Sequence, residues 1–229
     1  MRERLRRIDP RTLGILFVMF LFATVFWNTL LIYPIKLFVV ILHEFSHGLA
    51  AVLTGGKIVK IEVNQLAGGI CSTMGGSRFI VASAGYLGSI FWGGVILMIA
   101  TRTKRDNVLG IVIGGFLIVL SLLYIRNLFG FLFTVGFGVL LIVISAVAHN
   151  NIVDILMKFL GMTSCLYVII DIKSDLIDRS GIGSDADTIA RLLGFPGLSV
   201  FIGLVWIVLA LIAFIGFLWI ASKRDDATV

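Results

Sequence analysis

Two histidines and a glutamate stand within five residues in the segment HEFSH, as His43, Glu44 and His47. This spacing fits the pattern HExxH. On a helix, positions i and i+4 share one face, so the two imidazoles can bind one metal ion. Zinc suits such ligands, because it accepts imidazole nitrogen, lowers the pKa of bound water towards about 7 and polarises a carbonyl. Glu44 is then placed to act as a general base towards that water.

The residues around HEFSH are apolar, and so is most of the chain. Of its 229 residues, 59% are hydrophobic and 14% are charged, with a mean hydropathy of +1.09. A soluble globular protein of this composition could not cover its surface with polar groups. Several apolar runs are long enough to cross about 30 Å of hydrocarbon. We therefore expect an all-α, polytopic transmembrane helical bundle.

The apolar runs predict about seven spans in a single membrane-embedded domain over residues 1–229. Their expected ranges are 12–33, 35–54, 79–100, 108–125, 128–148, 152–172 and 197–221. The arginine-rich start, MRERLRRIDPR, predicts a cytoplasmic N-terminus. Seven spans then place the connections 55–78 and 173–196 in the cytoplasm as well. They also place the basic segment TRTKRDN outside, in conflict with the positive-inside rule.

The two longer connections are predicted to form local structure. In the first, KIVKIEV alternates apolar and polar residues before a pair of glycines, which predicts a short strand or β hairpin. Asn64 and Gln65 follow this strand, either in an ordinary hairpin turn, which we favour, or where a substrate could pair by strand addition. In the second, Ser184 is a candidate N-cap for a short surface helix. Arg126 and Asn127 fall at a tight turn between two spans, and we interpret them as interfacial anchors.

The membrane setting strengthens the interpretation of HEFSH as a metal site. Each ionisable group at mid-membrane costs about 2.5–3.5 kcal/mol even on the scale measured by insertion experiments. Ligand spacing explains His43, Glu44 and His47 together, whereas histidines that only hydrogen-bond between helices would match HExxH by chance. We therefore predict a metal site on this helix.

Two histidines leave a zinc site incomplete, because catalytic zinc usually has three protein ligands and a water. Asp171, near the inner end of the sixth span, is our first candidate for the third ligand. Asp175, one helical turn further along, is the second. Asp185 in GSDAD and Asp154 in HNNIVDIL follow. A solvated surface helix explains Asp185 equally well, and a helix cap explains Asp154 better.

Taken together, these segments resemble the site-2 protease family of intramembrane zinc metalloproteases. They are most similar to the small site-2-protease-like, or peptidase-like, membrane proteins of bacteria and plants. The resemblance covers most of residues 40–190 and runs through HEFSHGLAAVLTGG, GGICSTMGGSRFIVASAGYLGSIFWG and DIKSDLIDR…GSDA.

The resemblance implies zinc bound by His43 and His47, Glu44 as the catalytic base, and a third ligand from a later aspartate. It also implies substrates that are anchored in the membrane and cut within or near the bilayer. The chain departs from the family at one point, because the asparagine and prolines that lead into Leu-Asp-Gly do not occur here. DIKSD is the nearest acidic motif, so Asp171 is assigned by its position.

We therefore expect an intramembrane zinc metalloendopeptidase whose partners are membrane-protein substrates and the lipid bilayer. Neither a nucleic-acid partner nor a soluble small-molecule cofactor is expected. One alternative is a non-catalytic zinc-binding scaffold or pseudoprotease, which would not need Glu44 as a base. The other is a transporter of metal or protons, which would need a polar route that spans 108–125 and 128–148 scarcely offer.

Overall fold

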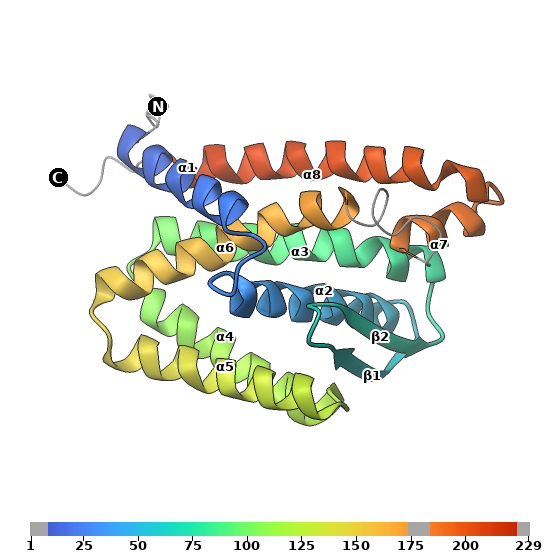
Figure 1. Ribbon diagram of the computed structural model, residues 1–229, viewed down its shortest axis with the longest axis horizontal. Coiled ribbons are helices and arrows are strands. Elements are labelled where there is room, and N and C mark those ends of the chain that lie inside the picture. Colours follow the sequence, from blue (N-terminus) through green and yellow to red (C-terminus); the bar gives the residue numbers. More distant parts are fainter. Residues whose placement is uncertain (1–8, 174–183, 224–229) are drawn as a thin grey trace, which may run out of the picture.

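The structure, a computed structural model, describes residues 9–173 and 184–223. Within these residues the chain forms long helices and one two-stranded hairpin (Figure 1). The elements in chain order are α1 (Pro10–Val25), α2 (Tyr33–Leu53), β1 (Lys57–Val63), β2 (Gly69–Met74), α3 (Arg78–Arg102), α4 (Asp106–Tyr124), α5 (Leu128–Val147), α6 (Asn150–Lys173), α7 (Asp185–Leu192), the 3-10 helix η2 (Pro196–Leu198) and α8 (Ser199–Ala221).

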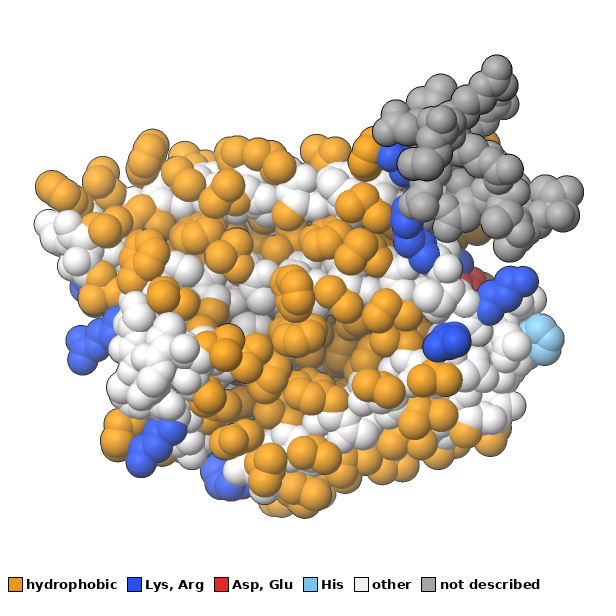
Figure 2. All heavy atoms as spheres, turned by 180° about the vertical axis from the view of Figure 1, so that it is seen from behind, with side chains coloured by type: hydrophobic (Ala, Val, Ile, Leu, Met, Phe, Trp, Pro, Cys, Tyr) orange, Lys and Arg blue, Asp and Glu red, His pale blue; other side chains and the backbone are white. Residues whose placement is uncertain are grey.

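Among the described residues, six helices are long and apolar enough to cross a membrane. They are α2, α3, α4, α5, α6 and the stretch that combines η2 with α8. Figure 2 shows hydrophobic side chains over the middle of one face, with Lys and Arg gathered towards its two ends. Charged groups are costly in hydrocarbon, so this distribution suits a protein embedded in a bilayer. The expected helical bundle with a hairpin after the HExxH helix is confirmed.

The expected first span, 12–33, is not one continuous helix. α1 ends at Val25 and α2 begins at Tyr33. With 16 residues, α1 is about 24 Å long, which is shorter than the roughly 30 Å of a hydrocarbon core. Phe22 packs on Phe159, and Trp27 packs on Tyr167, so the chain from α1 onwards runs beside α6 in the same direction.

Because α2 continues in that direction, α1 and α2 together make one passage towards the hairpin (Figure 1). The Asp9 N–H donates to the Ser222 carbonyl at 2.7 Å, and the Arg102 guanidinium donates to the Ile220 carbonyl at 2.8 Å. The start of α1 and the ends of α3 and α8 therefore meet at one end of the bundle. α3 begins next to the hairpin and is about 37 Å long, so the hairpin lies at the opposite end.

This arrangement corrects the expected topology. The hairpin and α7 share one end of the bundle, as predicted for the two long connections, but α1 begins at the other end. The prediction that these connections lie on the same side as the N-terminus is therefore wrong. The correction also brings TRTKRDN to the end where α1 begins, so its conflict with the positive-inside rule disappears.

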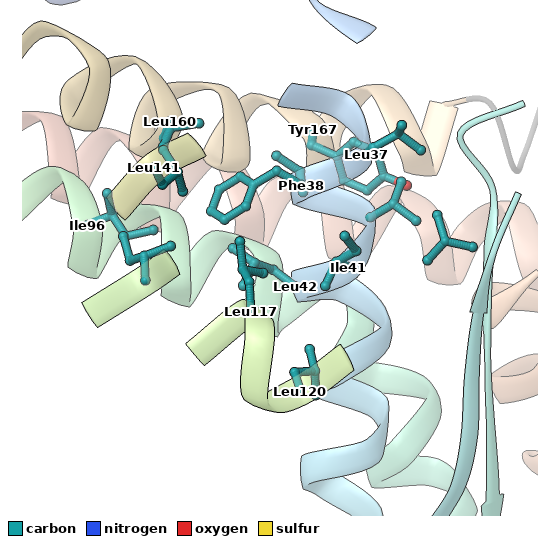
Figure 3. Close-up of a cluster of buried hydrophobic side chains, with 14 of the residues drawn as sticks. Leu37, Phe38, Ile41, Leu42, Ile96, Leu117, Leu120, Leu141, Leu160 and Tyr167 are labelled. Carbon is teal, nitrogen blue, oxygen red and sulfur yellow. The ribbon is translucent and has the colours of Figure 1, made fainter. Parts of the chain in front are cut away.

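The central position of α2 fixes the HExxH segment. Apolar side chains from all around α2 are buried, as in a helix surrounded by others. They pack on side chains from four neighbouring helices, and Figure 3 shows part of this cluster. Its labelled members are Leu37, Phe38, Ile41, Leu42, Ile96, Leu117, Leu120, Leu141, Leu160 and Tyr167.

The predicted hairpin is confirmed, with β1 and β2 antiparallel and Val63 opposite Gly69. Asn64 closes the turn, because its side-chain oxygen accepts hydrogen bonds from the N–H groups of Leu66 and Gly68. Local side-chain to backbone bonds of this kind favour asparagine in turns. The predicted place of Asn64 in the hairpin turn is therefore supported by these hydrogen bonds.

The turn between α4 and α5 holds the hairpin in place. The Asn127 side chain donates to the Val63 carbonyl at 2.6 Å and accepts from the Val63 N–H at 3.1 Å. The Arg126 N–H donates to the Ile61 carbonyl at 3.1 Å. Asn127 thus anchors β1, a role that the sequence did not reveal, and its place at the membrane interface stays a prediction.

Replacing Asn127 by alanine should destabilise the attachment of the hairpin. The Asn127→Ala change removes both hydrogen bonds to Val63, and we expect it to lower the free energy of unfolding by about 1–3 kcal/mol. Unfolding in mixed micelles, followed by circular dichroism, measures this effect. Asn107→Ala is the matched control, because Asn107 pairs with Asn150 at an exposed site. Equal stability of the two variants would contradict the anchoring role.

Candidate metal centre

The three HExxH side chains lie together near the middle of α2. His43, Glu44 and His47 are 7%, 6% and 8% exposed, so all three are buried. The imidazole ring centroids of His43 and His47 are 4.8 Å apart. The one-turn spacing therefore brings the two rings together, as HExxH predicts on a helix.

Asp185 of α7 meets both imidazoles. Its Oδ2 atom lies 3.3 Å from Nε2 of His43 and 3.2 Å from Nε2 of His47. One ligand atom from each of the three residues lies within 4.8 Å of the others. Two histidine nitrogens and one carboxylate oxygen form a donor set found in catalytic zinc sites. These residues therefore fit a zinc ion.

Asp185 is ionised in this setting. Burial by itself would raise the pKa of the carboxyl, but the charge of His47 and hydrogen bonds from both imidazoles outweigh it. The pKa of Asp185 is consequently held well below its usual range. A carboxylate must be deprotonated to bind a metal, so this environment prepares Asp185 as a ligand.

A capping box places Asp185 at the start of α7. The Ser184 hydroxyl accepts from the Asp187 N–H at 3.1 Å, and the Asp187 carboxylate accepts from the Ser184 N–H at 3.4 Å. The predicted helix after Ser184 is therefore confirmed. Its apolar face packs between α3 and α8 in a small buried cluster of Ala82, Ala186, Ile189, Ala190 and Ile202.

Close approach of α3 to α2 depends on glycine. A Cβ added at Gly85 would overlap Nε2 of both His43 and His47, and one at Gly88 would overlap the Ser46 side chain. The ring edges that bear Nε2 therefore face a space that a single methyl group would fill. The glycines of ASAGYLGS therefore let α3 pack closely against α2.

The site opens into a cavity of about 850 Å³. Its lining includes the three HExxH side chains, Asp171, Asp185 and the main-chain segment 68–71 of the hairpin. Gly69 stands directly against the catalytic candidate, since a Cβ there would lie 2.5 Å from Cγ of Glu44. The Glu44 side chain therefore extends from α2 to the start of β2.

Cys71 also lines this cavity but is not prepared to bind metal. Burial, with a further contribution from the charge of Glu44, raises the pKa of the Cys71 thiol to about 12. Zinc binds the thiolate, so a thiol with this pKa is a poor ligand at neutral pH. Cys71 and Cys165 are both free, in keeping with the sequence.

The other three aspartates considered as third ligand occupy different positions. Oδ2 of Asp171 lies 3.7 Å from Nδ1 of His43, which is the ring nitrogen that does not face Asp185. Asp154 is paired with Lys158 at 2.7 Å. Asp175 lies outside the described residues. Asp171 as a metal ligand stays a prediction, while the distances favour Asp185.

Two contacts of the histidines were not anticipated from the sequence. Nδ1 of His47 lies 2.7 Å from the carbonyl of Val81, and Nδ1 of His43 lies 3.4 Å from Oγ of Ser89. A backbone carbonyl has no residue signature, so the first could not be found by inspection. The second contact could have been suspected, because Ser89 is the last residue of SAGYLGS, which belongs to a segment that carries the family resemblance.

An HExxH helix buried within an apolar bundle defines a class, namely helical membrane proteins with a metallopeptidase-type centre. Comparison with protein families agrees, since the family described as Peptidase M50B-like matches residues 16–217. The chain belongs to the Peptidase M50B-like family. Comparisons with curated proteins and with solved structures gave no match.

Gly85→Ala should weaken metal binding without removing a ligand. The added methyl group would overlap Nε2 of both histidines, so we expect zinc affinity to fall at least about tenfold. Elemental analysis of protein purified with zinc measures the bound metal. Gly115→Ala is the control, because nothing lies within 4 Å of a Cβ at that position. Full zinc content in Gly85→Ala would show that the metal lies elsewhere.

Proposed function

We propose that this protein is an intramembrane zinc endopeptidase that cuts membrane-anchored protein substrates. The observation that carries the proposal is the buried group of His43, His47 and Asp185, with Glu44 in the same cavity. Membership of a peptidase family supports the reaction, and the six candidate spans support a substrate within the membrane. His43, His47 and Asp185 are the zinc ligands that this proposal assigns.

When bound, zinc would lower the pKa of a water and polarise the scissile carbonyl. Glu44 acts beside it as the general base that takes a proton from the attacking water. It then delivers that proton to the nitrogen of the leaving amine as the peptide bond breaks. Because Glu44 lies on the cavity wall and is only 6% exposed, it can meet the substrate while bulk water is kept away.

The substrate enters this site as an extended segment. A helical peptide bond is shielded by its own hydrogen bonds, so a membrane helix must unwind before it can be cut. Within the described residues, β2 has β1 as its one strand neighbour, and the chain segment 68–71 lines the cavity. Pairing of the substrate with the second edge of β2 would hold its backbone next to Glu44.

Charge distribution argues against the transport alternative. Between residues 107 and 147, which include most of α4 and all of α5, Arg126 is the one charged residue. A pathway for metal ions or protons needs polar groups at successive depths. The non-catalytic scaffold is a closer alternative, because it shares the zinc ligands and differs in its use of Glu44.

Glu44→Gln should separate a peptidase from a scaffold. We expect the variant to keep its zinc and to lose cleavage by about 10²–10⁴-fold, the usual contribution of a general base. The protein is reconstituted in vesicles with single-span membrane proteins from its host cell, and mass spectrometry counts newly formed N-termini. Asp154→Asn, on α6 and away from the site, is the control. Undiminished cleavage by Glu44→Gln would refute the proposed mechanism.

Gly69→Ala should impair catalysis through Glu44 and leave the zinc ligands in place. A methyl group at this position would lie 2.6 Å from Oε1 of Glu44, so the carboxylate has to move. We expect wild-type zinc content and at least about tenfold slower cleavage, since small misplacements of catalytic groups are costly. Thr73→Ala tests another cavity-lining residue of β2. Equal losses in the two variants would point to a general disturbance of the hairpin.

A further inference from the structure

The hydrogen-bond partner of His47 determines which of its ring nitrogens carries hydrogen. Nδ1 of His47 lies 2.7 Å from the Val81 carbonyl oxygen, and a carbonyl can only accept. Nδ1 is therefore the protonated nitrogen. Nε2, which lies 3.2 Å from Asp185, is then the nitrogen whose lone pair a bound metal would use.

At His43, side chains instead of backbone face Nδ1. The Ser89 hydroxyl donates its hydrogen to the Gly85 carbonyl at 3.0 Å, so towards His43 its oxygen is an acceptor. This oxygen lies 3.4 Å from Nδ1 of His43, and Oδ2 of Asp171 lies 3.7 Å from the same nitrogen. Two acceptors therefore face Nδ1, while Nε2 of His43 faces Asp185 at 3.3 Å.

α6 supplies further support for the His43 ring. Tyr167 and Asp171 are four residues apart and share a face of this helix. The Tyr167 ring centroid lies 5.9 Å from that of His43 in an edge arrangement. One turn further along the same face, the Asp171 carboxylate reaches Nδ1 of His43. The ring is thus supported by packing and by charge from one neighbouring helix.

We propose that Asp171 is a positioning residue, which together with Ser89 keeps hydrogen on Nδ1 of His43 and directs Nε2 towards the metal. This proposal rests on the zinc site proposed above. A carboxylate behind a metal-binding histidine fixes its orientation and makes it a stronger ligand. Asp171 has this place, while the oxygen that meets both Nε2 atoms belongs to Asp185.

The hydrogen position on each imidazole can be measured by nitrogen NMR on the full, zinc-loaded chain with ¹⁵N-labelled histidine. The chain has three histidines, and His149 at the turn before α6 serves as an internal reference. With zinc bound, we expect the wild type to show hydrogen on Nδ1 of both His43 and His47, because Nε2 then holds the metal. Asp171→Ala should shift the Nδ1 resonance of zinc-bound His43, since this N–H loses a neighbouring carboxylate, and leave His47 unchanged.

Metal binding gives a second readout, with Zn²⁺ for affinity and Co²⁺ for the ligand set. Loss of a residue that orients a metal ligand typically weakens affinity by about 10–100-fold. We expect Asp171→Ala to weaken Zn²⁺ binding by about this factor and to keep the visible absorption spectrum of bound Co²⁺. Asp185→Ala should change that spectrum, because it removes a ligand. Asp154→Ala, which lies on the same helix as Asp171, should match the wild type in both.

The results that would overturn the proposal are distinct from failure of the zinc site. Wild-type Nδ1 resonances and affinity in zinc-bound Asp171→Ala would exclude the positioning role. An altered Co²⁺ spectrum in Asp171→Ala, with a normal spectrum in Asp185→Ala, would make Asp171 the third ligand instead. A wild type that binds neither metal would refute the zinc site itself. Should Asp171→Ala misfold, Asp171→Asn is the second variant, because it keeps an acceptor oxygen and removes only the negative charge. Asp171→Glu, which keeps the charge, should then restore the zinc affinity that Asp171→Asn loses.

Discussion

Two imidazoles and the carboxylate of Asp185 lie side by side in an apolar helical bundle, and the structure depends on giving each of them a polar partner. An unpaired buried polar group costs roughly 2–7 kcal/mol in an apolar medium, and an isolated charge costs more. Here the carboxylate of Asp185 is shared by His43 and His47, whose other ring nitrogens face Val81 and Ser89. These partners come from α3 and α7, so the chemistry of α2 determines which elements must pack against it.

Polar partners at these distances require helices to approach more closely than large side chains allow. Glycines provide this approach on two faces of α3. Towards α2, Gly85 and Gly88 face the imidazoles and Ser46. Towards α6, a Cβ at Gly93 would lie 2.8 Å from the backbone nitrogen of Cys165. Small residues commonly serve such contacts between membrane helices. α3 is therefore held against both neighbours, and α6 is brought close enough for Asp171 to reach His43.

The sequence predicted those features that are determined by local pattern. The HExxH spacing, the alternating strand before paired glycines and the capping signal at Ser184 each predicted the element that the structure contains. These signals are local because they depend on periodicity and on side chains that bond their own backbone. The number of passages was harder to predict, because hydropathy alone could not reveal that α1 ends at Val25 and shares a passage with α2.

Asp185, the third ligand that we propose, lay beyond local pattern altogether. Depth along a span favoured Asp171, and depth is a sound guide as long as the ligand comes from a spanning helix. Asp185 instead belongs to an eight-residue helix outside the six candidate spans. It reaches the histidines because α7 packs on Ala82 of α3, a tertiary contact with no sequence periodicity of its own.

One face of α3 organises most of these contacts. Val81, Gly85 and Ser89 follow one another at four-residue intervals and therefore lie along one side of the helix. Val81 faces Nδ1 of His47, Gly85 leaves the Nε2 edges open, and Ser89 places its hydroxyl 3.4 Å from Nδ1 of His43. The adjacent Ala82 receives α7 and with it Asp185. The segment VASAGYLGS thus does more than let helices pack. The Val81 carbonyl, the absence of a side chain at Gly85 and the Ser89 hydroxyl each determine a different part of the site.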